Sequence, residues 1–200
     1  MANVTQLKHL EHLEDEMLNY GVEGCMASVN FLKELRKMLG CDNSTGFMQT
    51  KWDGAPSVVC GTDPNSGMFF VGTKSVFAKN SKACYDDVDV DLYYEGDLAE
   101  KLKYSLKYFS TLGIQGIVQG DLLFTTDVKR ETVNGEKLYT FTPNTITYGI
   151  PVDHPIGVAT GKAKIGVVFH THYRGNDFQT MQAVAGAKVK GSIEVLSVDN

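Results

Sequence analysis

The chain has 200 residues, of which 42% are hydrophobic and 22% are charged, and its formal net charge at pH 7 is −5. This length suits one domain, or one domain with an appendage. A mildly negative chain does not coat nucleic acid by charge alone, so such a partner would need a local basic groove. The sequence shows no apolar run that spans a membrane and no signal peptide, so we expect no membrane partner. Four widely spaced cysteines without a metal-binding pattern indicate reduced thiols in a cytoplasmic protein.

Two helices are predicted at the N-terminus. Apolar residues recur at helical spacing over residues 5–20 and again over residues 24–39, and a glycine follows each run. We therefore expect an N-terminal helical hairpin (residues 1–44) and a second domain (residues 45–200). Whether the second domain is complete at its C-terminus stays open.

A polar stretch, Thr50-Lys51-Trp52-Asp53-Gly54-Ala55-Pro56, separates two apolar segments. The pattern predicts a strand, a sharp turn and a second strand. In a strand, Lys51 and Asp53 would point to the same face. Gly54 lets the backbone turn or approach a ligand closely. A lysine beside a carboxylate and a glycine turn suits a covalent lysyl intermediate. The alternative is a surface hairpin in which Lys51 and Asp53 are merely solvated.

The next segments predict a hairpin and a helix. Apolar runs on either side of a turn-rich loop at residues 61–67 predict paired strands that lead into Thr73-Lys74-Ser75. Lys74 is a candidate phosphate contact or an exposed hairpin lysine. The alternating aspartates of residues 86–91 lack a calcium-loop pattern, and we expect a solvated loop there. Residues 95–110 read as a helix.

Residues 117–124 predict a strand that holds the polar stretch Gln119-Gly120-Asp121. A carboxylate inside an apolar strand is costly to bury without a partner. That partner could be a ligand hydroxyl, a metal or Lys51. Further along, residues 133–136 carry a strong hairpin-turn signal, and residues 146–150 predict another strand.

The C-terminal part is predicted as a loop, a strand, a helix and a last strand, in that order, over residues 151–162, 164–172, 177–186 and 192–198. His170 and His172 would share one face of their strand, where they could ligate a metal or serve a structural role. Lys188 and Lys190 form a Lys-x-Lys pair before the last strand.

Lys51-Trp52-Asp53-Gly54 resembles the Lys-x-Asp-Gly nucleotidyl-acceptor motif of covalent nucleotidyltransferases, which are the ATP-dependent DNA and RNA ligases and the mRNA capping enzymes. In that family, the lysine attacks the α-phosphate of a nucleotide and carries the nucleoside monophosphate as a phosphoramidate. The resemblance implies that Lys51 is the nucleophile and that Asp53 orients it or the metal. It also places Trp52 and Gly54 in the nucleotide site.

Later segments extend the resemblance. Thr73-Lys74-Ser75 is similar to the family's small basic motif, and Gly120-Asp121-Leu122 to its Gly-Glu-Leu motif, whose carboxylate contacts the ribose. Tyr148, with Phe141 as second choice, would stack on the nucleobase. Lys188 and Lys190 fit the pattern of the family's last motif, which contacts the α-phosphate. The resemblance is good over residues 46–150, but the family's Glu-Gly-x-Val motif lacks its acid here, where Ile165 precedes the glycine.

The resemblance and the alternation of short strands with turns imply an α+β fold: an antiparallel, twisted sheet core of the nucleotidyltransferase (ATP-grasp-like ligase) type with an N-terminal helical hairpin. ATP and Mg²⁺ are the implied cofactors, and RNA or DNA ends are the implied partner. We assign no metal ligands, and the oligomeric state stays open. The chain also resembles uncharacterised proteins of large tailed phages, which favours the host cytoplasm as its location. The alternatives are a non-catalytic nucleotide- or nucleic-acid-binding protein on the same fold, and a metal-dependent hydrolase centred on His170 and His172.

Overall fold

The computed structural model describes residues 12–40 and 51–198. The chain divides into two compact units between Lys51 and Trp52, and each unit is described by itself. The predicted beginning of the first helix and the apolar lead-in to Lys51 lie outside the described residues.

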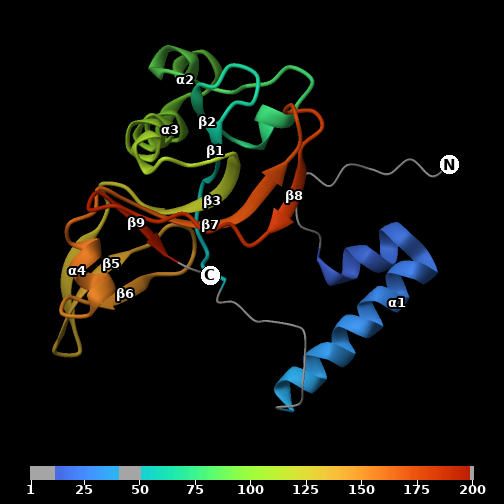
Figure 1. Ribbon diagram of the computed structural model, residues 1–200. Coiled ribbons are helices and arrows are strands. Elements are labelled where there is room, and N and C mark those ends of the chain that lie inside the picture. Colours follow the sequence, from blue (N-terminus) through green and yellow to red (C-terminus); the bar gives the residue numbers. More distant parts are fainter. Residues whose placement is uncertain (1–11, 41–50, 199–200) are drawn as a thin grey trace. The chain divides into compact units, whose positions relative to one another are not determined.

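The N-terminal unit is formed by α1 (Leu13–Leu39), which is interrupted at Gly21, where φ is 56° and ψ is −127°. The Ser28 hydroxyl donates a hydrogen bond to the Leu13 carbonyl oxygen at 3.2 Å, although these residues are 15 apart in sequence. A Cβ at Gly24 would clash with the backbone of the first arm, so the glycine lets the two arms approach. Figure 1 shows the chain reversing direction between the arms. The prediction of two helices is confirmed within residues 13–39.

The second unit is built around a main sheet with the strand order β2-β1-β3-β7-β8, and β9 pairs with β7. All of its strand pairs are antiparallel except β7 with β9. The strands are β1 (Ser57–Thr62), β2 (Phe69–Gly72), β3 (Ile117–Phe124), β7 (Ile165–Arg174), β8 (Gln182–Ala185) and β9 (Val195–Val198). The predicted α+β class with an antiparallel sheet is confirmed.

One face of the main sheet is covered by α3 (Gly96–Phe109), as Figure 1 shows. Leu102 and Phe109 of this helix are fully buried, and the Phe109 and Phe169 rings meet with their centroids 5.5 Å apart. Val118 and Leu122 of β3 belong to the same cluster. Their alternation along β3 turns Gln119 and Asp121 to the opposite face. This division of β3 decides where the polar side chains lie.

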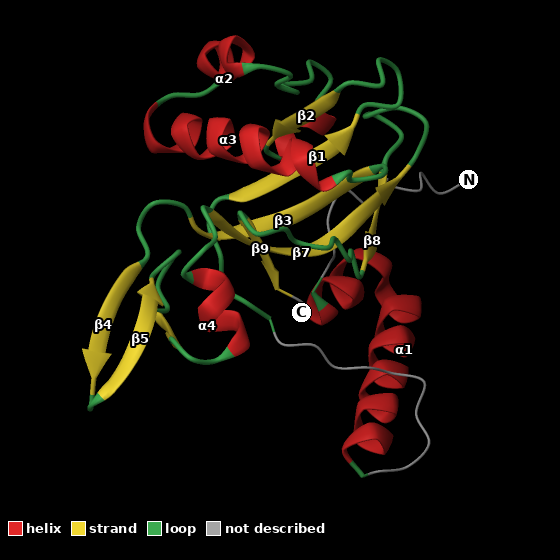
Figure 2. Ribbon diagram, turned by 60° about the vertical axis from the view of Figure 1, so that its left-hand side comes forward, coloured by secondary structure: helices red, strands yellow, loops and turns green. Residues whose placement is uncertain are grey.

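A smaller sheet, β4 (Lys129–Val133), β5 (Glu136–Phe141) and β6 (Tyr148–Pro151), continues from the end of β3. Figure 2 shows β4 and β5 projecting beside α4 (Pro155–Thr160). Val133 pairs with Glu136, and both residues between them have positive φ, as the predicted two-residue hairpin turn requires. Phe141 and Ile150 of this sheet pack with Leu123 and Phe124 of β3, so one core cluster joins the two sheets.

Three predictions for local structure are wrong. Residues 86–91 are not a loop, because Asp86 caps α2 (Asp87–Tyr93) and acidic residues in the first turn favour a helix N-terminus. Within the predicted loop 151–162, the His154 ring and Pro155 begin α4. The predicted helix over residues 177–186 is a turn followed by β8, which finds its hydrogen-bond partners in β7.

Two short 3₁₀ helices, η1 (Lys74–Phe77) and η2 (Ser110–Leu112), connect these elements. The predicted helix over residues 95–110 and the hairpin of β1 and β2 are confirmed. Within residues 12–40 and 51–198, no helix is long and apolar enough to cross a membrane.

Candidate functional site

Residues 52–56, which lead into β1, lie along β3. The Ala55 N–H donates to the Leu122 carbonyl oxygen at 2.9 Å, and the Leu122 N–H donates to the Pro56 carbonyl oxygen at 3.0 Å. These two bonds continue the ladder in which Ser57 pairs with Asp121. The segment is not the predicted strand and sharp turn, because residues 51–54 adopt no regular structure. Strand alternation therefore does not relate Lys51 to Asp53.

Gly54 packs directly against Asp121. A Cβ on Gly54 would lie 2.7 Å from the Asp121 Cβ and 2.8 Å from the Leu122 carbonyl oxygen. Real side chains do not tolerate such contacts, so the glycine is what permits the approach. The first and third segments of the nucleotidyltransferase resemblance are therefore in contact.

Asp53 is held by residues at the β5–β6 connection. Its N–H donates to the Tyr148 hydroxyl at 2.7 Å. Its carboxylate oxygens accept from the Asn144 amide and the Thr145 hydroxyl, both at 3.4 Å. The backbone bond is short and the two carboxylate bonds are long, so the main chain of Asp53 is fixed more firmly than its side chain.

Trp52 and Tyr148 pack against each other with ring centroids 4.9 Å apart and planes inclined by 41°. Tyr148 also lies against Phe141, and Phe141 is only 2% exposed. Both candidates for nucleobase stacking are therefore engaged in packing. Tyr148 contacts Trp52 and Asp53, the two residues that follow Lys51. The sequence did not indicate these contacts.

A chain of hydrogen bonds crosses the face of the sheet opposite α3. The Tyr173 hydroxyl donates to Gln119 Oε1 at 2.6 Å, and Gln119 Nε2 donates to the Ser57 hydroxyl at 2.8 Å. Burial raises the pKa of Tyr173 well above its usual range, so the phenol stays neutral. The sequence indicated no role for Ser57, Gln119 or Tyr173, although strand alternation places Gln119 on the same face as Asp121.

His170 is the extra residue of a β-bulge. Gln119 pairs with Thr171 and Gly120 with Phe169, so nothing on β3 lies directly opposite His170. Its Nδ1 is 2.8 Å from the Thr171 hydroxyl, and its Nε2 is 3.5 Å from Asp121 Oδ1. The bulge thus brings a histidine beside the Asp121 carboxylate.

The prediction that His170 and His172 share a face is wrong. His172 pairs with Val118, and directly paired residues point to the same side, which here is the α3 side. The bulge keeps His170 on the side of Asp121. Among the described residues, no group of three His, Cys, Asp or Glu side chains could hold a metal ion.

Lys74 lies at the same end of the sheet as residues 52–56. β2 ends opposite Val59, so Lys74 follows at the end where residues 52–56 enter β1. Its side chain is exposed. Lys51 is also exposed and is joined directly to Trp52.

Lys188 and Lys190 are not brought to this site. They line a hollow of about 260 Å³ together with residues 112–115 and Val118. Val189, between them, packs against the cluster that contains α3. The two lysines therefore lie on the face of the sheet opposite Asp121.

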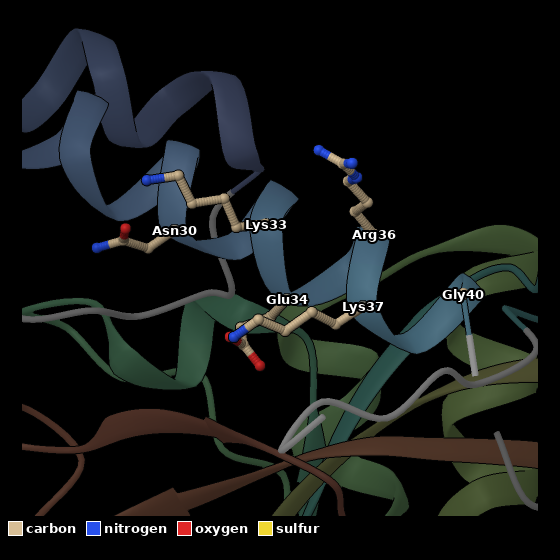
Figure 3. Close-up of a pocket in the computed structure, with 6 residues that line it drawn as sticks. All are labelled: Asn30, Lys33, Glu34, Arg36, Lys37 and Gly40. Carbon is tan, nitrogen blue, oxygen red and sulfur yellow. The ribbon is translucent and has the colours of Figure 1, made fainter. Parts of the chain in front are cut away.

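A larger hollow, of about 690 Å³, lies along the last turns of α1. Figure 3 shows Glu34 and Lys37 meeting there, while Lys33 and Arg36 extend away from that pair. The Lys37 ammonium is 2.6 Å from the Glu34 carboxylate. The described residues that line this hollow are an exposed ion pair, two further cations, Asn30 and Gly40, and exposed ion pairs contribute little, so we place the candidate site in the second unit.

Comparison with known proteins identifies the family of the chain, but it indicates no activity. No curated protein and no solved structure matches the chain significantly. A family model described as "Family of unknown function (DUF6267)" matches residues 3–200. Because that match spans most of the sequence, the chain belongs to the family of unknown function DUF6267.

Proposed function

We propose that this protein is an ATP-dependent nucleotidyltransferase of the RNA or DNA ligase type, which forms a covalent lysyl-AMP intermediate on Lys51. The supporting observation is the close packing of Gly54 against Asp121. It joins the two segments whose resemblance to the nucleotidyltransferases is clearest. RNA or DNA ends are the proposed acceptors of the AMP.

The proposed step is a displacement at the α-phosphate of ATP. The Lys51 ammonium is exposed and must lose a proton to solvent before the amine attacks, because a lysine is ordinarily charged at neutral pH. A bond then forms between Nζ and the α-phosphorus, and the bond between that phosphorus and the bridging oxygen breaks. Pyrophosphate leaves with the bond's electron pair, and AMP remains on the lysine as a phosphoramidate.

Nearby residues take the remaining roles. Asp121 accepts a hydrogen bond from a hydroxyl of the ribose, and Lys74 balances negative charge on the phosphates. Asp53 is the carboxylate suited to Mg²⁺, because its hydrogen bonds are long and Mg²⁺ commonly uses only one or two carboxylates. Bound Mg²⁺ would neutralise phosphate charge. Tyr148 and Trp52 support the segment that carries Lys51.

The test is intact-mass spectrometry after incubation with ATP and Mg²⁺. The wild-type chain gains one AMP, and Lys51→Ala gains none. Lys79→Ala is the matched control, because Lys79 is an exposed lysine in the loop after η1. No adduct on the wild type, or equal adducts on wild type and Lys51→Ala, contradicts the proposal.

A second candidate is a non-catalytic nucleotide- or nucleic-acid-binding protein. It is favoured by the position of Lys188 and Lys190 on the opposite face and by Ile165 in place of an acid. Calorimetry separates the two functions. ATP binding without an adduct supports the binding protein, and binding with an adduct supports the enzyme.

A further inference from the structure

The buried Nε2 of His170 has no hydrogen-bond partner, although the Asp121 carboxylate lies close by. The separation of 3.5 Å from Nε2 to Oδ1 exceeds the usual 2.7–3.2 Å of an N–H···O bond. Within the described part of the chain, His170 is the only Lys, Arg or His side chain that the structure places within ion-pair distance of Asp121. The two groups are adjacent but not tightly bonded.

The other side of the His170 ring contacts Thr171. Thr171 is 2% exposed, and its hydroxyl lies 2.8 Å from His170 Nδ1. Either group can donate in this contact, and we take the tautomer in which the hydroxyl donates to Nδ1 and the ring hydrogen is on Nε2. That N–H then faces Asp121. The bulge that separates Gln119 from Gly120 in the pairing holds this arrangement in place.

We propose that His170 is a positioning residue for nucleotide binding, and that it acts by holding the Asp121 carboxylate. The inference rests on the proposed role of Asp121, which is to accept a hydrogen bond from a ribose hydroxyl. Nε2 is covered by protein, so this nitrogen faces Asp121 and not the solvent. When a nucleotide binds, shortening of the 3.5 Å separation to a hydrogen bond from Nε2 to one oxygen would fix the carboxylate and leave the other oxygen for the ligand.

Two amide substitutions at His170 separate this role from general packing. The Gln side chain carries its amide to the position of Nε2, whereas the Asn side chain reaches only the position of Nδ1. His170→Asn lowers ATP affinity about tenfold, and His170→Gln restores most of it. The rate of adduct formation at saturating ATP changes little in either variant, because the effect is on binding.

A double-mutant cycle tests whether His170 acts through Asp121, with ATP affinity measured by calorimetry. Asp121→Asn alone weakens binding, and adding His170→Asn to it has no further effect. Additive losses, or equal losses in the Asn and Gln variants, overturn the role of His170. Binding of ATP without any adduct contradicts the covalent chemistry but leaves this test intact.

A measurement without nucleotide checks the pairing itself. Nitrogen NMR of the ring, assigned with His170→Gln, shows a hydrogen on Nε2, and Asp121→Asn shifts that resonance. A hydrogen on Nδ1, or a resonance indifferent to Asp121→Asn, overturns the proposal even if ATP binds. Failure of the wild type to bind ATP overturns both this proposal and the proposed function.

Discussion

Gly54 and Asp121 pack so closely that the space between their backbones admits no additional methyl group. A Cβ on Gly54 would stand 2.7 Å from the Asp121 Cβ. Two backbone hydrogen bonds with Leu122 hold this contact in register. The segment that follows Lys51 is therefore fixed to the strand that carries Asp121.

Gly54→Ala forces the two segments apart. Overpacking of this kind costs about 1–3 kcal/mol of unfolding free energy, which urea denaturation measures. The yield of the AMP adduct also falls in Gly54→Ala, because Asp121 moves relative to residues 52–56. Gly149→Ala is the control, since a methyl there meets the end of the Leu138 side chain, which can move. Equal stability of the two variants would show that the contact is loose.

Tyr148 supports the Lys51 segment through its hydroxyl and its ring. Tyr148→Phe removes the acceptor of the Asp53 N–H and lowers stability by about 0.5–1.5 kcal/mol. Tyr148→Ala also removes the ring contact with Trp52, which is the only tryptophan in the sequence. We expect its fluorescence emission to shift to longer wavelength in the Ala variant and not in the Phe variant. Identical emission spectra of the Ala and Phe variants would show that Trp52 does not pack against Tyr148 in solution.

Alkaline pH tests the bond between Tyr85 and Asp63, in which the Tyr85 hydroxyl donates at 2.8 Å. Burial and this bond raise the pKa of Tyr85 to about 12. In the unfolded chain a tyrosine loses its proton near pH 10, whereas folded Tyr85 keeps it to about pH 12. The stabilisation is complete below pH 10 and is lost as pH rises to 12.

Denaturation at pH 9, 10, 11 and 12 should therefore show a steeper loss of unfolding free energy for the wild type than for Tyr85→Phe. Tyr93→Phe is the control, because Tyr93 is exposed. A wild-type slope equal to that of Tyr85→Phe would mean that the bond does not hold the proton in solution.

The lysines differ in their expected effect on adduct formation. Lys74 lies at the end of the sheet that holds residues 52–56, so Lys74→Ala should lower the adduct rate about tenfold through the loss of a charged phosphate contact. Lys188 and Lys190 lie against residues 112–115 on the other face. Their double alanine variant should react at the wild-type rate. A larger loss in the double variant than in Lys74→Ala would reverse this assignment.

Local patterns predicted much of the fold. The helix at residues 95–110 and the turn at residues 133–136 were predictable because apolar spacing and an Asn-Gly pair decide them locally. The strand at residues 182–185 was not, since it is formed by pairing with β7. The helix at residues 87–93 was not predictable from its alternating aspartates, because their pattern suits a solvated run as well as a helix that Asp86 caps.

The candidate site was also predictable only where local patterns decide the structure. The strand that holds Asp121 was predictable from its apolar residues, but the contact between Gly54 and Asp121 was not, because the sequence offered only a ligand hydroxyl, a metal or Lys51 as the partner of that carboxylate. The position of His170 was not predictable either, because a bulge changes which way a side chain points and is set by pairing between distant strands. The packing of Tyr148 on Trp52 also depends on the joining of two sheets, which no local pattern encodes.

The most direct test of the account is to locate the nucleotide on the chain. The protein is incubated with ATP and Mg²⁺ and digested, and the peptide that contains residues 51–56 is sequenced by tandem mass spectrometry. We predict one AMP on the side-chain nitrogen of Lys51, through a bond that acid cleaves and mild alkali does not. AMP on any other residue, or an unmodified Lys51 peptide from protein that binds ATP, would contradict the account.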